Sequence, residues 1–254
     1  MLLAVDIGNT NIVLGIVEGG NIMGVSRLRT ERTETADEYA IKIKAILEMN
    51  GFSLQDIDDA IISSVVPPVT GSARRAVKMI TGKDPMVIGN GLKVGLEILI
   101  DNPKQLGSDL IVDAAAVVAK YSLPAVIIDM GTATTISVVD EGAKYLGGVI
   151  MPGPRTSIQA LAANAAQLPS ISIEEPASLI GRNTVDCMRS GVVLGHAAAL
   201  DGMIDRIEAE LGRKTTIIAT GGLAPVILPN CIHEIIYDDD LLISGLYEIY
   251  KNNV

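Results

Sequence analysis

One pattern occurs twice in the sequence, about half a chain apart. Residues 2–17 read LLAVDIGNTNIVLGIV, and residues 125–139 read AVIIDMGTATTISVV. Each passes from an apolar run through Asp-x-Gly and small polar residues into a second apolar run. Asp6 therefore matches Asp129, and Gly8 matches Gly131. An internal repeat on this scale predicts two similar domains, each built around the same β-hairpin.

The residues of these turns suit the binding of phosphate. A tight turn made of Gly, Asn and Thr presents backbone N–H groups and hydroxyls that hold phosphate oxygens without a lysine. An Asp at the end of the first strand would repel phosphate, so its predicted role is to hold a cation, or a water in the shell of that cation. For a single copy, an ordinary β-turn is an equal alternative. Two copies in equivalent positions favour two hairpins that clasp a polyphosphate across a cleft.

Composition excludes several classes of protein. Of 254 residues 48% are hydrophobic and 20% charged, and with one Phe and no Trp the predicted core is aliphatic. The apolar runs are strand-sized and MLLAV lacks a basic leader, which predicts neither a membrane span nor a signal peptide. A net charge of −10 disfavours a nucleic-acid partner. Cys187 and Cys231 have no metal-ligand spacing, as in a reduced, cytoplasmic protein.

Periodicity predicts the same order of elements in both halves. In the first half we expect strands at 2–7, 11–17, 21–28, 59–67 and 84–89, and helices at 36–51 and 69–82. In the second half we expect a helix starting at 102–103, strands at 124–129, 133–139, 144–150 and 215–222, and helices at 185–211 and 238–251. The predicted domains are residues 1–115 and 116–254, each with one phosphate hairpin.

Five segments occur in an order that is similar to one known family. They are DIGNTN at 6–11, LGSDL at 106–110, IDMGTATT at 128–135, GGVIMPG at 147–153 and ATGG at 219–222. The sequence resembles the type III pantothenate kinases over essentially its whole length. The resemblance implies the fold of the acetate-kinase, sugar-kinase, Hsp70 and actin superfamily: an α/β protein of two tandem ribonuclease-H-like domains, with mixed five-stranded sheets flanked by helices and a nucleotide-clamping cleft. It also implies ATP-dependent phosphorylation of pantothenate to 4′-phosphopantothenate, the first step of coenzyme A biosynthesis.

The resemblance also assigns roles to residues. It implies that Asp109 is the catalytic base, that Asp129 binds potassium or ammonium, and that ATP enters with Mg²⁺. The expected ATP contacts are Asp6, Ile7, Gly8, Asn9, Thr10, Asn11, Ile12, Val13 and Thr132. The expected acceptor residues are Ile100, Gly107, Ser108, Asp109, Leu110 and Thr184. Family members are homodimers in which the residue matching Thr184 reaches the substrate of the neighbouring subunit, and the long apolar helix behind it would be the dimer helix, although burial within one subunit is an alternative.

The sequence departs from the family pattern in the acceptor half of the site. The family reads Gly-Ala-Asp-Arg followed by an Asn, whereas this chain has Ser108 in place of the Ala, Leu110 in place of the Arg and Asp113 in place of the Asn. Ile100 stands where the family usually has a Tyr. These changes add negative charge where a carboxylate substrate would bind. Two alternatives therefore stay open: a related kinase with a different hydroxyl acceptor, and a nucleotide-binding regulator without catalysis.

Overall fold

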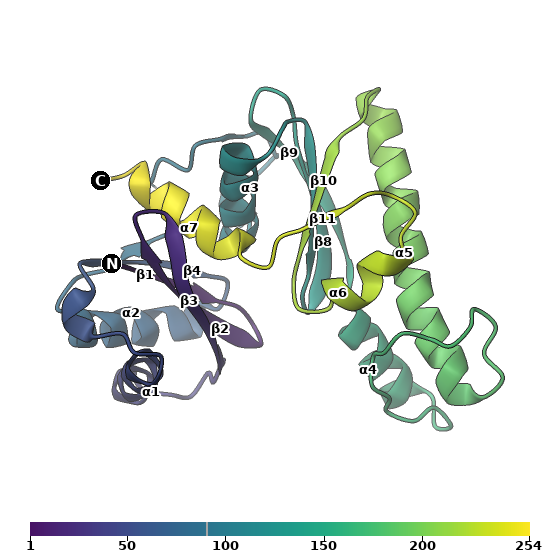
Figure 1. Cartoon of the computed structure of the whole chain (residues 1–254), viewed down its shortest axis with the longest axis horizontal. Coiled ribbons are helices and arrows are strands. Elements are labelled where there is room, and N and C mark those ends of the chain that lie inside the picture. Colours follow the sequence, from purple (N-terminus) through teal and green to yellow (C-terminus); the bar gives the residue numbers. More distant parts are fainter. Residues whose placement is uncertain (90) are drawn as a thin grey trace. The chain divides into compact units, whose positions relative to one another are not determined.

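The computed structural model describes residues 1–89 and 91–254, and it is an α/β protein (Figure 1). The chain forms two compact units. Unit 1 contains Met1–Glu97, Asp101–Lys120 and Asp240–Val254, and unit 2 contains Ile98–Ile100 and Tyr121–Asp239. In the described part of the chain, no helix is long and apolar enough to cross a membrane.

Unit 1 is built on a five-stranded sheet in the order β3-β2-β1-β4-β5. Its strands are β1 (Leu2–Ile7), β2 (Asn11–Glu18), β3 (Asn21–Arg29), β4 (Asp59–Ser64) and β5 (Met86–Val87). The first three form an antiparallel meander, and β4 and β5 continue the sheet parallel to β1. The helices of the unit are α1 (Ala36–Met49), α2 (Pro67–Thr81), α3 (Ser108–Lys120) and α7 (Leu241–Lys251), with short 3-10 turns η1 (Leu54–Asp56) and η2 (Pro103–Gln105).

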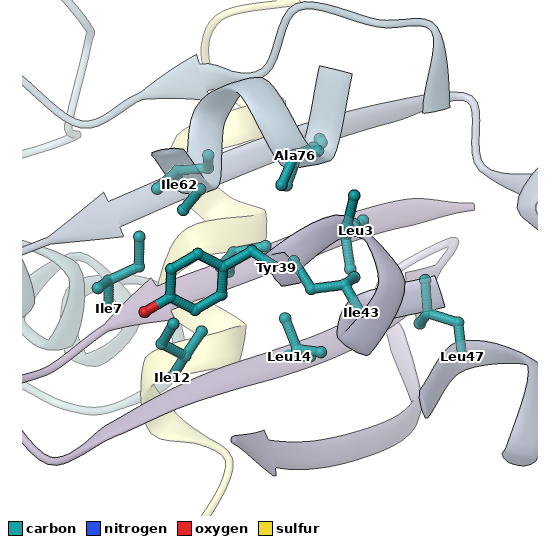
Figure 2. Packing of buried hydrophobic residues seen from close by; sticks show 14 of the residues in the cluster. Leu3, Ile7, Ile12, Leu14, Tyr39, Ile43, Leu47, Ile62 and Ala76 are labelled. Atoms are coloured by element: carbon teal, nitrogen blue, oxygen red, sulfur yellow. The ribbon is translucent and has the colours of Figure 1, made fainter. Parts of the chain in front are cut away.

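The central strand β1 is buried on both faces. Leu3, Val5 and Ile7 pack into a cluster with α1 and α2, whereas Leu2 and Ala4 pack into a second cluster with α3 and α7. Figure 2 shows the first cluster, in which the ring of Tyr39 from α1 lies beside Ile7 and Ile12. The Tyr39 hydroxyl donates to the Glu31 carbonyl at 2.6 Å and accepts from the Glu31 N–H at 3.1 Å, so this buried polar group is satisfied.

Unit 2 repeats the strand order of unit 1 and adds one strand. Its sheet has the order β11-β10-β7-β8-β9-β6. The strands are β6 (Glu97–Ile98), β7 (Ala125–Met130), β8 (Ala133–Val139), β9 (Lys144–Pro152), β10 (Thr216–Thr220) and β11 (Ile236–Tyr237). The helices are α4 (Pro154–Asn164), α5 (Thr184–Leu211) and α6 (Ala224–Ile227), followed by the 3-10 turn η3 (Leu228–Asn230). Val126, Ile128 and Met130 of β7 face a cluster that includes Val193 and Leu200 of α5.

Several elements differ from those expected. The sheet of unit 2 has six strands instead of five because β6 joins it, and neither β6 nor α6 was predicted. The helix expected from 102–103 starts at Ser108, because Asn102 caps only a 3-10 turn and Leu106 has extended backbone angles. Helix α4, which begins at Pro154, was not predicted. The expected division at residues 115 and 116 lies inside α3, and the expected second domain includes α7, which packs within unit 1 because Leu246 and Ile249 bury their side chains against Leu2 and Val112.

The close packing of α7 on α3 depends on Gly245. A Cβ at this position would lie 2.0 Å from the Val112 carbonyl oxygen. We expect Gly245→Ala to lower the free energy of unfolding by about 3 kcal/mol, measured by urea denaturation, because backbone atoms must move to relieve the contact. Gly71→Ala in α2 is the matched control: a Cβ there meets nothing within 4 Å, so it should stabilise by about 0.5–1 kcal/mol. Equal effects of the two variants would contradict this account.

Candidate active site

The turn of the first hairpin is held from the β3 side. The Gly8 N–H donates to the Asn11 carbonyl at 3.0 Å. Thr30, which follows β3, donates its N–H to the Thr10 carbonyl at 3.0 Å and its hydroxyl to the Gly8 carbonyl at 2.6 Å. Two carbonyl oxygens that would repel a phosphate are thereby engaged by Thr30. Sequence reasoning missed this residue, since a Thr after an edge strand carries no distinctive pattern.

The hairpin residues expected to bind ATP fall into two groups. Asn9, Thr10 and Asn11 are exposed at the turn, where their side chains are accessible to a ligand. Ile7 and Ile12 are fully buried in the core, so only their backbone atoms are available for binding. Val13 is half-buried and packs against the cluster on the α3 and α7 face of the sheet. The structure therefore confines the accessible side chains of this segment to the turn.

Two polar side chains lie at the same end of one sheet face in unit 1. Asp6 alternates with Leu2 and Ala4, which places it on the face that α3 and α7 cover, and it is 6% exposed. Its register partner on the parallel strand β4 is Ser63, which is fully buried. The Ser63 hydroxyl donates to the Ser108 hydroxyl at 2.9 Å, so the start of α3 is bonded to this end of the sheet. Ser63 was not predicted from the sequence. The two serines that end the apolar strand β4 could have indicated it.

Asp109 lies in the first turn of α3, one residue after this contact. Its carboxylate Oδ1 accepts a hydrogen bond from the Leu110 N–H at 2.8 Å. A Cβ on Gly107 would lie 2.4 Å from the same oxygen, so the glycine leaves the space that the carboxylate occupies. Burial raises the pKa of the Asp109 carboxyl above its ordinary value, while the backbone hydrogen bonds oppose this. A desolvated carboxylate with a raised pKa is a stronger proton acceptor, which suits a general base.

The second hairpin is braced by the β9–α4 connection. Its turn is one residue shorter than the first, since Met130 pairs with Thr134 whereas Ile7 pairs with Ile12. The Thr132 carbonyl accepts from the Gly153 N–H at 3.1 Å and from the Thr156 hydroxyl at 2.5 Å. A Cβ on Gly153 would lie 2.3 Å from the Gly131 carbonyl oxygen, so this contact requires glycine.

The expected cation ligand and ATP contact of unit 2 both belong to this hairpin. Asp129 alternates with Val126, Ile128 and Met130, which places it on the sheet face opposite α5. Its register partner on β10 is Thr220, which is 6% exposed. Thr132 is exposed at the turn. Asp129 is thus the next-to-last residue of β7 in unit 2, as Asp6 is of β1 in unit 1.

The residues expected to bind the acceptor are distributed over both units. Gly107, Ser108, Asp109 and Leu110 belong to unit 1, whereas Ile100 and Thr184 belong to unit 2. Ile100 lies beside Gly147 of β9. Thr184 is the first residue of α5, after the cap Asn183.

Thr184 also lines a cavity of about 560 Å³ that is bordered by α4, α5 and the end of β9. The buried ring of His196 lines the same cavity, and its nitrogens contact the carbonyl oxygens of Val192 and Pro152 at 2.7 and 3.2 Å. The walls are otherwise mainly apolar, with Ile158 and Leu161 of α4 among them.

Comparison with known proteins places this geometry in a family. The family profile described as type III pantothenate kinase matches residues 2–206. A type III pantothenate kinase of Halalkalibacterium halodurans is 42% identical over 254 residues, which cover 100% of both chains. The chain belongs to the type III pantothenate kinase family. The family assignment made from the five sequence segments is confirmed.

Solved structures share the fold of this family member. A protein of Campylobacter jejuni described as a conserved putative Baf family transcriptional activator aligns with a TM-score of 0.62 and 20% identity, over 98% of this chain and 97% of that one. Component A of the (R)-2-hydroxyglutaryl-CoA dehydratase of Acidaminococcus fermentans aligns with a TM-score of 0.55 and 16% identity, over 98% of this chain and 96% of that one. The predicted pair of ribonuclease-H-like domains is confirmed.

The raised pKa of Asp109 has a consequence for stability. The folded protein favours the protonated form of a carboxyl whose pKa is higher in the folded than in the unfolded state. The resulting stabilisation is fully present below the unfolded-state pKa and is lost as the pH rises through the folded-state pKa. At pH 7 the ionised Asp109 therefore costs stability. We expect Asp109→Asn, which keeps an oxygen for the Leu110 N–H, to raise the melting temperature at pH 7, with the difference vanishing near pH 3. A lower melting temperature at pH 7 would contradict the burial of this charge.

Proposed function

We propose that this protein is an ATP-dependent kinase that phosphorylates pantothenate at its 4′-hydroxyl. The proposal is carried by its full-length similarity to type III pantothenate kinases together with the buried carboxylate of Asp109 at the start of α3. Asp109 accepts the proton of the acceptor hydroxyl as the phosphoryl group is transferred. Since phosphoryl transfer needs mainly positioning and charge stabilisation, one well-placed carboxylate suffices as the protein base.

The hairpin turns hold the phosphates of ATP. Asn9, Thr10 and Asn11 of unit 1 and Thr132 of unit 2 are exposed turn residues of the types that bind phosphate oxygens through amides and hydroxyls. The engagement of the Gly8 and Thr10 carbonyls by Thr30 supports this role for the first hairpin, because it keeps oxygen lone pairs away from the ligand.

The carboxylates at the strand ends fit the cations that the reaction requires. Among the described residues no group of three or more His, Cys, Asp or Glu side chains could hold a metal ion. Mg²⁺ is usually held by one or two carboxylates together with substrate phosphates and waters. Asp6 is the proposed contact to the shell of Mg²⁺, and Asp129 the proposed ligand of potassium or ammonium. These cations supply positive charge beside the phosphates.

We propose that the protein acts as a homodimer through α5. The cavity beside Thr184 is lined mainly by apolar side chains, and Gly191 and Gly195 of α5 meet nothing within 4 Å at their Cβ positions. Small residues on an exposed helix face permit another helix to approach closely. Thr184 would then contact the acceptor bound to the neighbouring subunit.

A second candidate is a kinase of the same kind with a different acceptor. The first two turns of α3 carry Asp109 and Asp113, and the first basic residue of this helix is Lys120 in its last turn. Leu110 offers no charge to a substrate carboxylate. Loss of one charge-assisted hydrogen bond costs on the order of 1.5–3 kcal/mol. This candidate favours an acceptor that is neutral or cationic.

Replacing the proposed base tests the reaction. We expect Asp109→Asn to lower kcat for ADP release with pantothenate by at least about a hundredfold while the Kd for ATP changes less than about threefold, because the base does not contact the nucleotide. The wild-type protein is assayed in parallel with pantothenate and its amide. A higher kcat/KM for the amide would favour the second candidate. No ADP release with any hydroxyl acceptor would indicate a nucleotide-binding regulator.

The monovalent cation is tested by exchange of salts. With Mg²⁺ constant, we expect replacing sodium by potassium or ammonium to raise kcat/KM for ATP about tenfold or more, and Asp129→Asn to remove the difference. The matched control is Asp140→Asn, beyond the end of β8, whose carboxylate accepts the N–H groups of Gly142 and Lys144 and should leave the cation dependence unchanged. Equal rates in sodium and potassium for the wild type would contradict the role of Asp129.

A further inference from the structure

The start of α3 is attached to β4 by a small network of serines. The Ser108 hydroxyl oxygen accepts two hydrogen bonds, one from the Ser64 N–H at 3.0 Å and one from the Ser63 hydroxyl at 2.9 Å. Ser63 is fully buried and is the register partner of Asp6. Both donors therefore belong to the end of β4, which lies between β1 and β5, and the acceptor precedes Asp109 by one residue.

This geometry gives Ser108 a structural role beside its expected place in the acceptor site. Its oxygen accepts hydrogen bonds from two donors of β4, which fixes where the side chain of Ser108 lies. On the other side of Ser108, Gly107 leaves the space into which the Asp109 carboxylate folds, 2.4 Å from where a Cβ would stand. The Leu110 N–H then holds that carboxylate at 2.8 Å. Gly107 thus leaves room for the carboxylate, Ser108 bonds the helix start to β4, and Asp109 carries the carboxylate.

We propose that Ser108 is a positioning residue, which fixes the Asp109 carboxylate by anchoring the first turn of α3 to Ser63 and Ser64. This inference rests on the proposed role of Asp109 as the base. An anchored helix start keeps the carboxylate in its buried orientation, toward Gly107 and the Leu110 N–H. Ser108 stands where the family pattern has Ala, so this anchor is particular to this chain. When the anchor is removed here, the first turn is free to fray and the carboxylate reaches positions in water.

The network predicts effects on the chemical step and on the acidity of Asp109. We expect Ser108→Ala to lower kcat for pantothenate phosphorylation about tenfold, with the KM for ATP within about twofold, since small displacements of a reacting group cost rate rather than nucleotide affinity. The pKa of the Asp109 carboxyl, followed by carbon-13 NMR of aspartate-labelled protein, should fall toward its ordinary value as the group becomes hydrated.

The other charged groups around α3 stay constant in this experiment. On α3 itself they are Asp113 and Lys120, on β4 there is Asp59, and on α7 there are Glu248 and Lys251. Asp6 at the end of β1 lies on the same face of the sheet. Because the Ser108→Ala substitution alters none of these charged groups, a change in the pKa of Asp109 can be attributed to a change in the hydration of its carboxylate.

Ser137→Ala provides the matched control. Ser137 and Tyr145 form another buried hydroxyl–hydroxyl hydrogen bond, at 2.8 Å, in unit 2. Its loss should lower the melting temperature comparably, without changing kcat or the pKa of Asp109. Ser63→Ala, which removes one of the two donors, should give a smaller change in the same direction and serves if Ser108→Ala does not fold.

The outcomes separate this inference from the proposed function. A Ser108→Ala protein that loses stability like Ser137→Ala but keeps the wild-type kcat and pKa of Asp109 would overturn the positioning role. A wild-type protein that phosphorylates no acceptor would overturn the proposed function, and the NMR titration would still decide whether Ser108 controls Asp109. A lowered kcat with an unchanged Asp109 pKa would also contradict the proposed role of Ser108 in fixing the carboxylate.

Discussion

Burial of β1 on both faces is the constraint on which unit 1 depends. Its first four side chains after Met1, Leu2, Leu3, Ala4 and Val5, alternate between the cluster under α1 and α2 and the cluster under α3 and α7, and each is 4% exposed or less. A strand with two apolar faces needs helices on both sides. Asp6 lies near the end of this strand, on the face that α3 covers. The position of the polar residue therefore follows from the packing of its apolar neighbours.

The same packing places the candidate base. Helix α3 covers the sheet face that carries Asp6, and α7 presses against α3 where Gly245 meets Val112. The serine contacts at Ser108 then fix which residue of α3 lies at the strand ends. Apolar burial supplies most of the energy and is not directional, whereas the hydrogen bonds select one register. Asp109 needs both in order to hold a single orientation.

The candidate site also illustrates a conflict between stability and chemistry. A carboxylate that is desolvated at the start of a helix is a better base because its pKa is raised, and for the same reason it destabilises the fold at neutral pH. The hairpin turns show the opposite arrangement, since their carbonyl oxygens are hydrogen-bonded to Thr30, Gly153 and Thr156. The polar groups of the proposed phosphate-binding turns are hydrogen-bonded, whereas the proposed base is a buried charge that costs stability.

Local sequence was sufficient for most of the strands and for the family. The doubled Asp-x-Gly pattern predicted both meanders, and β1, β2, β7 and β8 lie within one residue of the expected bounds, because alternation and turn residues act over short distances. The boundaries of α3 and the existence of α4 were not predicted: Pro103 has the same helix-start preference as Pro154, yet only Pro154 begins an α-helix. Whether the segment after such a proline continues as an α-helix depends on the residues against which it packs.

Tertiary structure alone decided the assignment of α7 to unit 1, the burial of Ile7 and Ile12 within a segment expected to bind ATP, and the contact of Ser63 with Ser108. Each of these joins residues that are far apart in the chain or distinguishes the two faces of one strand. A sequence lists which side chains are available and how they alternate. Only the closed core determines which of them remain accessible to a ligand and which polar groups are brought within hydrogen-bonding distance.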